Sequence, residues 1–550
     1  MVNNMSDVSS PSVRQRPRLR HTDGDVRGDA DVLVIGGGPA GSWAAISAAE
    51  SGAGVFLVDK GYCGTTGAAA SAGVGVWYVE PDAEARERAM QDREALGGWL
   101  VDRNWMGRVL DETYARVGQL ADWGYPFPVK ESGEQARTSL QGPEYQRRMR
   151  RQVVRSRVTI LDHSPAVELL RVPDGAVAGA TGVRRQRGGR WTIRTRSVIV
   201  ATGGCGFLSG GLGCDVLTGD GHLMAAELGA DLSGMEFSNA YAISPTFASV
   251  TKTALYHWAT FYHEDGRVLE GAGSQKGRSV IAQALAHEQV YAQLDRAPVP
   301  MQPEMRAAQP NFFLPFDRLG VDPFRQRFPV TLRLEGTIRG TGGLRITDER
   351  CATTVPGLYA AGDAATRELI CGGFTGGGSH NAAWAISSGV WAGRGAAAHA
   401  KASGSPGGRA EGAGGVGLRP TATTDATLDW REITRSVQAE VQPFEKNYFR
   451  AESQLQRSLR TLDAAWAQAR GGLGGGVEDV VRRRESVAML AHARWMYNSA
   501  LDRPETRGMH KRIDRPQLDP EQWHRKLVGG LDEVWTSVDP LAPVSTPVAA

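Results

Sequence analysis

Short apolar runs alternate with helical patterns near the start of the chain. Residues 31–35 read Asp-Val-Leu-Val-Ile, a continuous apolar run that is typical of a strand buried in a parallel sheet. Glycines follow, then an alanine-rich helical pattern to about residue 53 and a second apolar strand over 55–58. This order predicts a βαβ unit whose second strand ends at Asp59.

Further elements of both kinds follow along the chain. They are strands over 158–161, 166–170 and 197–201, and helices over 82–98, 104–124 and 221–229. Between about 238 and 340, prolines, aromatic residues and polar residues dominate and the βαβ pattern stops, which indicates an inserted cap. The strand-then-glycine pattern returns at 358–361, and 381–399 and most of 428–503 have helical patterns.

Composition and charge exclude several classes of protein. The chain has 550 residues, 41% of them hydrophobic, and a net charge of +3, so it can bury a large core and offers no basic surface for nucleic acid or an anionic membrane. No apolar run reaches the roughly 18 residues of a membrane span. No apolar segment follows the arginines of 14–20, which argues against a secretory signal.

The cysteines argue against a metal centre. There are five, all scattered and none in CxxC spacing, which is unlike a disulfide framework, a zinc site or an iron–sulfur cluster held by this chain. We therefore expect no metal and a cytoplasmic location, where thiols stay reduced.

A glycine motif carries the first sign of chemistry. Residues 36–41, Gly-Gly-Gly-Pro-Ala-Gly, match G-x-G-x-x-G: Gly36 permits the tight turn, Gly38 lets a pyrophosphate approach the backbone, and Gly41 lets helix and strand pack closely. The helix N-terminus presents free N–H groups to phosphates. Asp59 ends the second strand and can accept hydrogen bonds from a ribose diol, so the pattern predicts a dinucleotide site.

Two later segments favour FAD over NAD as the dinucleotide. Residues 198–204 read Val-Ile-Val-Ala-Thr-Gly-Gly, and 358–363 read Leu-Tyr-Ala-Ala-Gly-Asp. Both place glycines at strand ends, where open α/β sheets bind cofactors. Asp363 adds a carboxylate that can hold a polyol such as ribitol.

From about residue 31 to residue 535 the chain resembles the succinate dehydrogenase and fumarate reductase flavoprotein family, which includes L-aspartate oxidase and the flavoprotein subunit of adenylylsulfate reductase. The resemblance rests on segments 31–59, 201–204, 218–237, 353–363, 372–393 and 503–512, in family order. Ser379-His380-Asn381 is closer to the adenylylsulfate reductase branch than to the dicarboxylate-reducing branch.

The resemblance implies an α/β fold with a Rossmann-like FAD-binding domain, an inserted α+β capping domain and a C-terminal helical domain. In chain order we expect a disordered arm (1–29), the FAD-binding domain (30–237), the substrate-binding cap (238–343), the FAD-binding domain again (344–402), a linker (403–427), the helical domain (428–537) and a tail (538–550).

The motifs and the resemblance together give the residues expected to bind FAD. They are Gly36, Gly38, Pro39, Ala40, Gly41, Asp59, Lys60, Thr65, Thr66, Ala70, Ala166, Ala201, Thr202, Gly203, Asp220, Gly362, Asp363, Ser379, His380 and Asn381.

Departures from the family pattern are equally informative. Many members tether FAD through a histidine after the second strand, but residues 64–74 contain none, so we expect non-covalent FAD. Dicarboxylate-reducing members carry His-Pro-Thr where this chain has 244–246, Ser-Pro-Thr, and an arginine where it has Gly376. A later histidine is replaced by Ile338 or Arg339. The substrate-carboxylate clamp is therefore largely absent.

Three residues are candidates for catalysis. The resemblance implies that Arg278, ahead of a helix, is a proton shuttle, the alternative being a capping or surface arginine. His380 is expected beside the flavin, where it can titrate near neutral pH, the alternative being a packing role. His257 lies in a segment expected to line the substrate cleft with Lys252, Tyr256, Trp258, Tyr262 and His263.

The leading interpretation is an FAD-dependent oxidoreductase that transfers hydride between FAD and a small polar or anionic substrate. The alternatives are a flavoprotein electron-transfer subunit that works with an iron–sulfur protein, a flavin monooxygenase of secondary metabolism, and a flavin-binding scaffold without catalysis. We expect a small-molecule substrate as the partner, with an iron–sulfur electron-transfer protein and a homo-oligomer left open.

Overall fold

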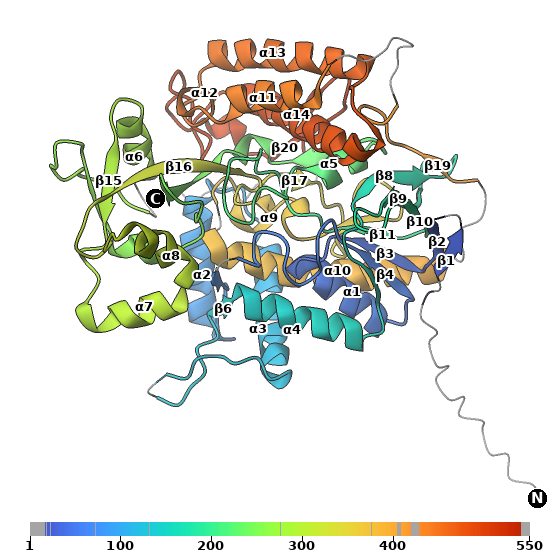
Figure 1. Ribbon diagram of the computed structural model, residues 1–550, viewed down its shortest axis with the longest axis horizontal. Coiled ribbons are helices and arrows are strands. Elements are labelled where there is room, and N and C mark those ends of the chain that lie inside the picture. The colour runs from blue at the N-terminus through green and yellow to red at the C-terminus, as the bar shows by residue number, and fades with distance from the viewer. Residues whose placement is uncertain are drawn as a thin grey trace, which may run out of the picture.

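The structure of the chain is a computed structural model. It describes residues 17–540 apart from 18, 23, 72, 131, 275–276, 376, 404–408 and 420–427. Figure 1 shows three parts: an α/β domain, a cap in green to its left, and a layer of helices in orange and red above it.

A five-stranded parallel sheet forms the centre of the α/β domain. Its order is β18 (Leu358–Ala360), β11 (Val198–Val200), β3 (Val32–Ile35), β4 (Val55–Val58) and β7 (Thr159–Leu161). Every residue of the first four strands is buried. Strands buried on both faces need apolar side chains at every position, which explains why their sequences show no alternation.

Two long helices pack against each other beside this sheet. They are α1 (Pro39–Glu50) and α10 (Gly377–Ser403), which begins four residues before the expected helix. A Cβ at Gly389 would lie 2.5 Å from the Ala40 carbonyl oxygen, and one at Gly393 would lie 2.4 Å from that of Ala44. The small residues of α10 therefore permit a backbone approach that larger side chains would prevent.

Further helices and short strands complete the α/β domain. They are β5 (Gly73–Gly75), α2 (Ala83–Leu96), α3 (Arg103–Asp122), β6 (Ser139–Gln141), α4 (Gly142–Arg155), α5 (Asp220–Ala226), η1 (Met235–Phe237) and α9 (Glu368–Cys371).

A second sheet corrects two expectations from the sequence. Its order is β1 (Leu19–Thr22), β2 (Asp25–Asp29), β10 (Arg190–Arg194), β9 (Val177–Val183), β8 (Ala166–Arg171) and β19 (Glu411–Gly412). The prediction of a disordered arm is thus wrong for residues 19–22 and 25–29, because β1 pairs with β2 and β2 pairs in parallel with β10. The prediction of an unstructured linker is wrong for β19, because this strand pairs with β8. The rest of the arm before residue 17, and residues 541–550 of the tail, lie outside the described residues.

The cap is an antiparallel sheet with helices packed on it. The strand order is β13 (Ala240–Pro245), β16 (Phe328–Gly336), β15 (Val290–Gln293) and β14 (Thr260–Tyr262). The helices are α6 (Arg278–Leu285), α7 (Gln302–Ala308) and α8 (Pro310–Leu319). Phe316 of α8 packs edge-on against Phe328 of β16, with ring centroids 4.7 Å apart, so aromatic side chains form the core of the cap.

The C-terminal part consists mainly of helices. They are α11 (Trp430–Val441), α12 (Phe444–Asn447), α13 (Glu452–Gly471) and α14 (Val480–Leu501). The chain then returns to the α/β domain through β20 (Lys526–Gly529) and β21 (Trp535–Val538), with β20 paired to β12 (Leu232–Ser233), which in turn pairs with β17 (Gly343–Leu344). The whole confirms the expected fold class.

Among the described residues, none of the helices has both the length and the apolar character needed to cross a membrane.

A fully buried ion-pair chain joins the C-terminal segment to η1. Arg503 Nε lies 2.7 Å from Glu236 Oε1, and its Nη1 lies 3.0 Å from Glu505 Oε1. Arg507 Nε contacts the same Glu505 oxygen at 2.5 Å. All four side chains have no exposed surface, so removing one cation would leave a buried carboxylate without its partner.

We predict that Arg503→Met lowers the free energy of unfolding by about 3–5 kcal/mol, because Glu236 would keep its charge in a dry site. Chemical denaturation measures this. The matched control is Arg267→Met, whose partner Asp265 is 53% exposed and whose own side chain is 76% exposed. It should change stability by no more than about 0.5 kcal/mol. Equal losses in both variants would contradict the structural role of the buried chain.

Candidate functional site

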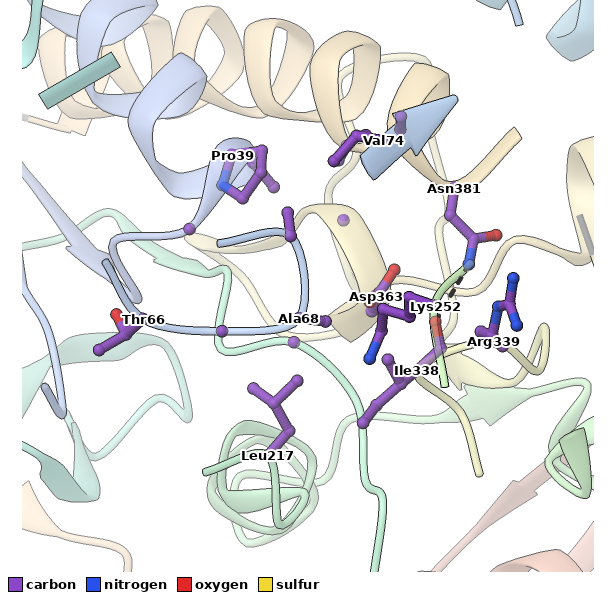
Figure 2. A pocket seen from close by; sticks show the side chains of 18 of the residues that line it. Pro39, Thr66, Ala68, Val74, Leu217, Lys252, Ile338, Arg339, Asp363 and Asn381 are labelled. Atoms are coloured by element: carbon purple, nitrogen blue, oxygen red, sulfur yellow. Dashed lines mark hydrogen bonds between the residues drawn. The ribbon is translucent and has the colours of Figure 1, made fainter. Parts of the chain in front are cut away.

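A cavity of about 1440 Å³ extends from the α/β domain to the cap. Its lining includes the glycine turn after β3, the residues that follow β4 and β11, and the cap segment 251–257. Figure 2 shows Pro39 and Thr66 at the left of the view, Asn381 and Arg339 at the right, and Ala68 and Lys252 between them. The cavity lies at the carboxyl ends of parallel strands, where open α/β sheets bind ligands.

The glycines of the turn between β3 and α1 have different physical causes. Gly36 has φ +111°, and a Cβ there would lie 2.2 Å from the Ala201 carbonyl oxygen; a Cβ at Gly41 would lie 1.8 Å from the Gly36 carbonyl oxygen. Protein packing therefore requires both. Gly38 has φ −71° and its Cβ would meet no protein atom within 4 Å. The protein therefore leaves open space at this glycine, on the wall of the cavity, where an occupant can approach the backbone.

Unpartnered polar atoms also point to an occupant. The Thr202 hydroxyl and Asn381 Oδ1 are buried and have no hydrogen-bond partner within the described part of the chain, and both residues line the cavity. Gly38 is the N-cap of α1 and offers no side-chain cap, with Pro39 at the first helical turn. The first N–H groups of this helix are thus available to phosphate oxygens.

Asp59 ties the turn to the end of β4. Its carboxylate accepts hydrogen bonds from the Gly37 N–H at 2.6 Å, the Gly61 N–H at 2.7 Å and the Thr66 hydroxyl at 2.9 Å. The carboxylate therefore holds the glycine turn in place as well as lining the cavity.

Lys60 is the centre of a charged cluster on the same wall. Its Nζ lies 2.7 Å from Asp220 Oδ2 and 2.6 Å from Glu485 Oε1. Burial alone lowers the pKa of Lys60, but the two carboxylates outweigh burial and raise it, so the ammonium stays charged. Asp220 begins α5 and Glu485 lies on α14, so this cluster connects the cavity wall to the helical part.

Most residues expected to bind FAD line the cavity. They are Gly36, Gly38, Pro39, Ala40, Asp59, Lys60, Thr66, Ala166, Ala201, Thr202, Gly203, Asp220, Gly362, Asp363, Ser379 and Asn381.

Four expected residues do not line it. Gly41 packs α1 against the turn. Thr65 is exposed and its hydroxyl donates to the Tyr62 carbonyl. Ala70 closes a turn with its N–H on the Gly67 carbonyl, so only its neighbours 66–69 reach the cavity. His380 packs on Trp77, with ring centroids 4.4 Å apart, because the start of α10 directs Ser379 and Asn381 inward instead.

Three cations line the cap end of the cavity: Lys252, Arg278 and Arg339. Lys252 Nζ and Arg339 Nη1 each lie 3.3 Å from the carboxylate of Glu335, which is fully buried in β16. Arg278 donates to the Tyr241 carbonyl oxygen at 3.3 Å and forms no ion pair within the described residues. Burial first, and Arg339 second, lower the pKa of Arg278 to about 10.

The other side chains of the expected cleft segment divide into two groups. Lys252, Tyr256 and His257 line the cavity, with His257 exposed at its edge. The remaining three do not line it: the Tyr262 hydroxyl donates to Asp295 Oδ2 at 2.8 Å, His263 Nδ1 lies 2.5 Å from Glu288 Oε1, and Trp258 packs in the cap core. Gly376 lies outside the described residues.

Sequence reasoning missed Glu335 and the part that Arg339 plays. Glu335 is an acid in a buried strand, next to Leu334 and Gly336, and a buried acid normally has a cationic partner. That signal was available in the sequence, but its partner Lys252 is 83 residues away, and no local pattern joins the two.

Two buried histidines lie behind the cavity wall. The rings of His222 on α5 and His492 on α14 have centroids 4.9 Å apart, and both side chains are fully buried. Burial lowers the pKa of His222 to about 4 and takes that of His492 well below its usual range. Both rings are thus neutral at pH 7.

Two protein-family models match this chain, and one of them covers the part that contains the glycine turn. Residues 31–247 match the FAD binding domain family, and residues 445–533 match the fumarate reductase flavoprotein C-terminal family. The fumarate reductase flavoprotein subunit of Mycobacterium tuberculosis (strain CDC 1551 / Oshkosh) is 27% identical over 91% of this chain and 96% of its own length.

Solved structures show the same fold. The quinol fumarate reductase FrdA of E. coli aligns with a TM-score of 0.80 at 21% identity, over 95% of this chain and 98% of that one. The adenylylsulfate reductase of Archaeoglobus fulgidus aligns with a TM-score of 0.73 at 18% identity, over 98% and 100%. These scores do not favour the adenylylsulfate reductase branch, so that finer placement stays a prediction.

The glycine turn, the free helix N-terminus and the unpartnered polar atoms fit an FAD molecule, and the protein is an FAD-dependent oxidoreductase. More specifically, it carries both the FAD binding domain and the fumarate reductase flavoprotein C-terminal domain, and over 91% of its length it is similar to a fumarate reductase flavoprotein subunit.

We predict that Gly38→Val weakens FAD binding at least tenfold, because the added side chain would occupy space that the protein itself leaves open. The flavin content of the purified variant, and titration of the apoprotein with FAD, measure this. Gly118→Val is the matched control, since Gly118 in α3 also has no atom within 4 Å of a built Cβ but does not line the cavity. Normal flavin content in Gly38→Val would contradict the placement of the pyrophosphate.

The buried histidines predict acid sensitivity. Between pH 6.5 and about 4 the unfolded chain binds protons on His222 and His492 that the folded chain cannot, so the free energy of unfolding should fall as the pH falls through this window. His222→Leu should make this decline shallower, measured as the slope of unfolding free energy against pH. His287→Gln, at an exposed position of the cap, should leave the slope unchanged. An unaltered slope in His222→Leu would rule out this origin of the acid sensitivity.

Proposed function

We propose that this protein transfers hydride between non-covalently held FAD and a small anionic substrate that binds between the cap and the FAD-binding domain. The observation that carries the proposal is Arg278, a cation at the cavity wall with no acidic partner within the described residues. A desolvated cation without a counter-ion is costly, so its presence in a cavity indicates an anionic occupant.

The lining supports non-covalent attachment of FAD. Residues 66–69, 73 and 74 line the cavity and include only threonine, glycine, alanine and valine. Cys63, which precedes this segment, is fully buried and does not line the cavity; burial and then Asp59 raise its pKa to about 12, which keeps it in the unreactive thiol form.

Bound FAD supplies the hydride chemistry, and the chain supplies binding, orientation and protons. Arg278 fits two of these roles. Its guanidinium can hold a substrate oxyanion through two N–H groups. Its lowered pKa of about 10 also brings it nearer than an ordinary arginine to releasing a proton, which supports the role of proton shuttle. His257, exposed at the cavity edge, is the second candidate for proton exchange.

An electron-transfer subunit with an iron–sulfur partner is the second candidate function. It is favoured by the name of the Mycobacterium tuberculosis relative, a flavoprotein subunit. Among the described residues no group of three or more His, Cys, Asp or Glu side chains could hold a metal ion. On this reading the electrons would leave through another protein, in the cytoplasm that the scattered cysteines favour. The flavin monooxygenase stays a prediction.

The test is an anaerobic screen of flavin reduction, and of reoxidation of the dithionite-reduced protein, with C2–C8 carboxylates, hydroxycarboxylates and amino acids. Each is paired with its uncharged amide. We expect at least one anion to exchange electrons with the flavin and its amide to fail. Equal reaction with an anion and its amide, or reaction with no anion, would contradict the proposal.

With the reactive anion in hand, Arg278→Ala should keep its flavin and lose at least about 100-fold in the rate of flavin reduction, as expected for loss of a proton donor or an oxyanion ligand. Arg278→Lys should recover part of the rate. Arg318→Ala, at an exposed position of α8, is the control and should react normally. A normal rate in Arg278→Ala would remove this residue from the mechanism.

A further inference from the structure

We propose that Lys252, Arg278 and Arg339 form one subsite for a single anionic head group, and that the rest of the substrate is uncharged and largely apolar. This names the substrate class and rests on the proposed function. It separates the protein from enzymes that hold a small molecule by a carboxylate at each end.

Two of the three cations, Lys252 and Arg339, converge on Glu335. Glu335 accepts a hydrogen bond from the Thr251 hydroxyl at 2.6 Å, lies 3.3 Å from Lys252 Nζ through the same oxygen, and lies 3.3 Å from Arg339 Nη1 through the other. Because one buried carboxylate contacts both cations, their charged ends lie at the same place in the cavity. They therefore serve one anionic group rather than two separated ones.

The third cation belongs to the same group. Arg278 donates to the carbonyl oxygen of Tyr241, which pairs with Leu334, the residue before Glu335, and Arg339 is the strongest charged influence on Arg278. The repulsion between like charges is offset by an anion placed among them, and Glu335 already contacts Arg339 and Lys252. An anionic head group of the substrate would complete this arrangement.

The charges at this end do not cancel. Glu335 is ionised, since Lys252 and Arg339 outweigh the effect of burial and lower its pKa to about 2. Asp363, the other acid nearby, has its own partner, with Oδ1 2.6 Å from Arg367 Nη1. Three cations thus share one carboxylate, Glu335, which leaves an excess of positive charge for a carboxylate or phosphate head group.

The surrounding wall explains why the rest of the substrate is uncharged. Apolar side chains line the cap end beside the three cations, namely Ile243, Ala254, Leu255, Tyr256, Ala308 and Ile338, together with the uncharged polar side chains of Thr251, Thr253, Ser274 and Gln309. A second carboxylate placed against this wall would lose its hydration without gaining a cation. The wall therefore favours an apolar body over a dicarboxylate.

Isothermal titration of the oxidised holoenzyme tests the subsite through binding, without turnover. The probes are acetate, butanoate, hexanoate and octanoate, with octyl phosphate, octanedioate and octanamide. We expect affinity to rise along the monocarboxylate series. Octanoate or octyl phosphate should bind at least tenfold tighter than octanedioate and octanamide, and the better of the two identifies the head group.

Three results would overturn the inference: octanedioate binding as tightly as octanoate, octanamide binding as tightly as octanoate, or no binding by any monoanion. The inference and the proposed function fail separately. Tight octanoate binding without any redox exchange in the anion screen would contradict the function alone. Redox exchange with a dicarboxylate that binds best would contradict the inference alone.

Two variants locate the head group. Lys252→Met and Arg339→Gln should each weaken octanoate binding at least tenfold while the protein keeps its flavin. Arg325→Gln is the matched control, because this cap arginine is 84% exposed and does not line the cavity. If one variant misfolds, the other still tests the position of the head group. Unchanged octanoate affinity in both, with full flavin content, would place the head group elsewhere.

Discussion

The close approach of backbone at the turn between β3 and α1 is the constraint on which the rest of the structure depends. Gly36 lies so near the Ala201 carbonyl, and Gly41 so near that of Gly36, that a Cβ at either position would collide with backbone. This approach brings the ends of β3 and β11 together. It also seats α1 where α10 can pack on it through Gly389 and Gly393. The cofactor site is the space that remains in front of this turn.

Charge defines the other end of the cavity. The cations there come from different parts of the chain: Lys252 from a cap loop, Arg278 from the start of α6, and Arg339 from the segment after β16. The buried ion-pair chain around Arg503 anchors the C-terminal segment to η1, next to the first cap strand. Because these residues are far apart in the sequence, only the folded cap brings them together. The anion site therefore depends on the cap being held against the FAD-binding domain.

Much of this arrangement could be predicted because it is local. The β3–glycine–α1–β4 unit, the strands before Thr202 and Gly362, and helix α10 each follow from a sequence pattern that spans neighbouring residues. The strands β1, β2 and β19 could not be, because short polar segments form strands only when a distant partner such as β10 or β8 is present.

The substrate end was harder to predict for a related reason. The absence of the family's clamp residues at 244–246 and Ile338 was visible in the sequence, but the cations that gather around Glu335 were not, since only folding brings Lys252 and Arg339 to one carboxylate. His380 is a different case, because its expected role beside the flavin stays a prediction. Its neighbours in the motif line the cavity, whereas its own ring packs on Trp77 because of the orientation of α10.

The most direct test of the central claim is the visible spectrum of the purified protein before and after acid precipitation. The account predicts a yellow protein whose flavin is released into the supernatant as FAD. Flavin that stays in the pellet would contradict the non-covalent site lined by residues 66–69, 73 and 74. A colourless protein that cannot be reconstituted with FAD would contradict the cofactor assignment itself.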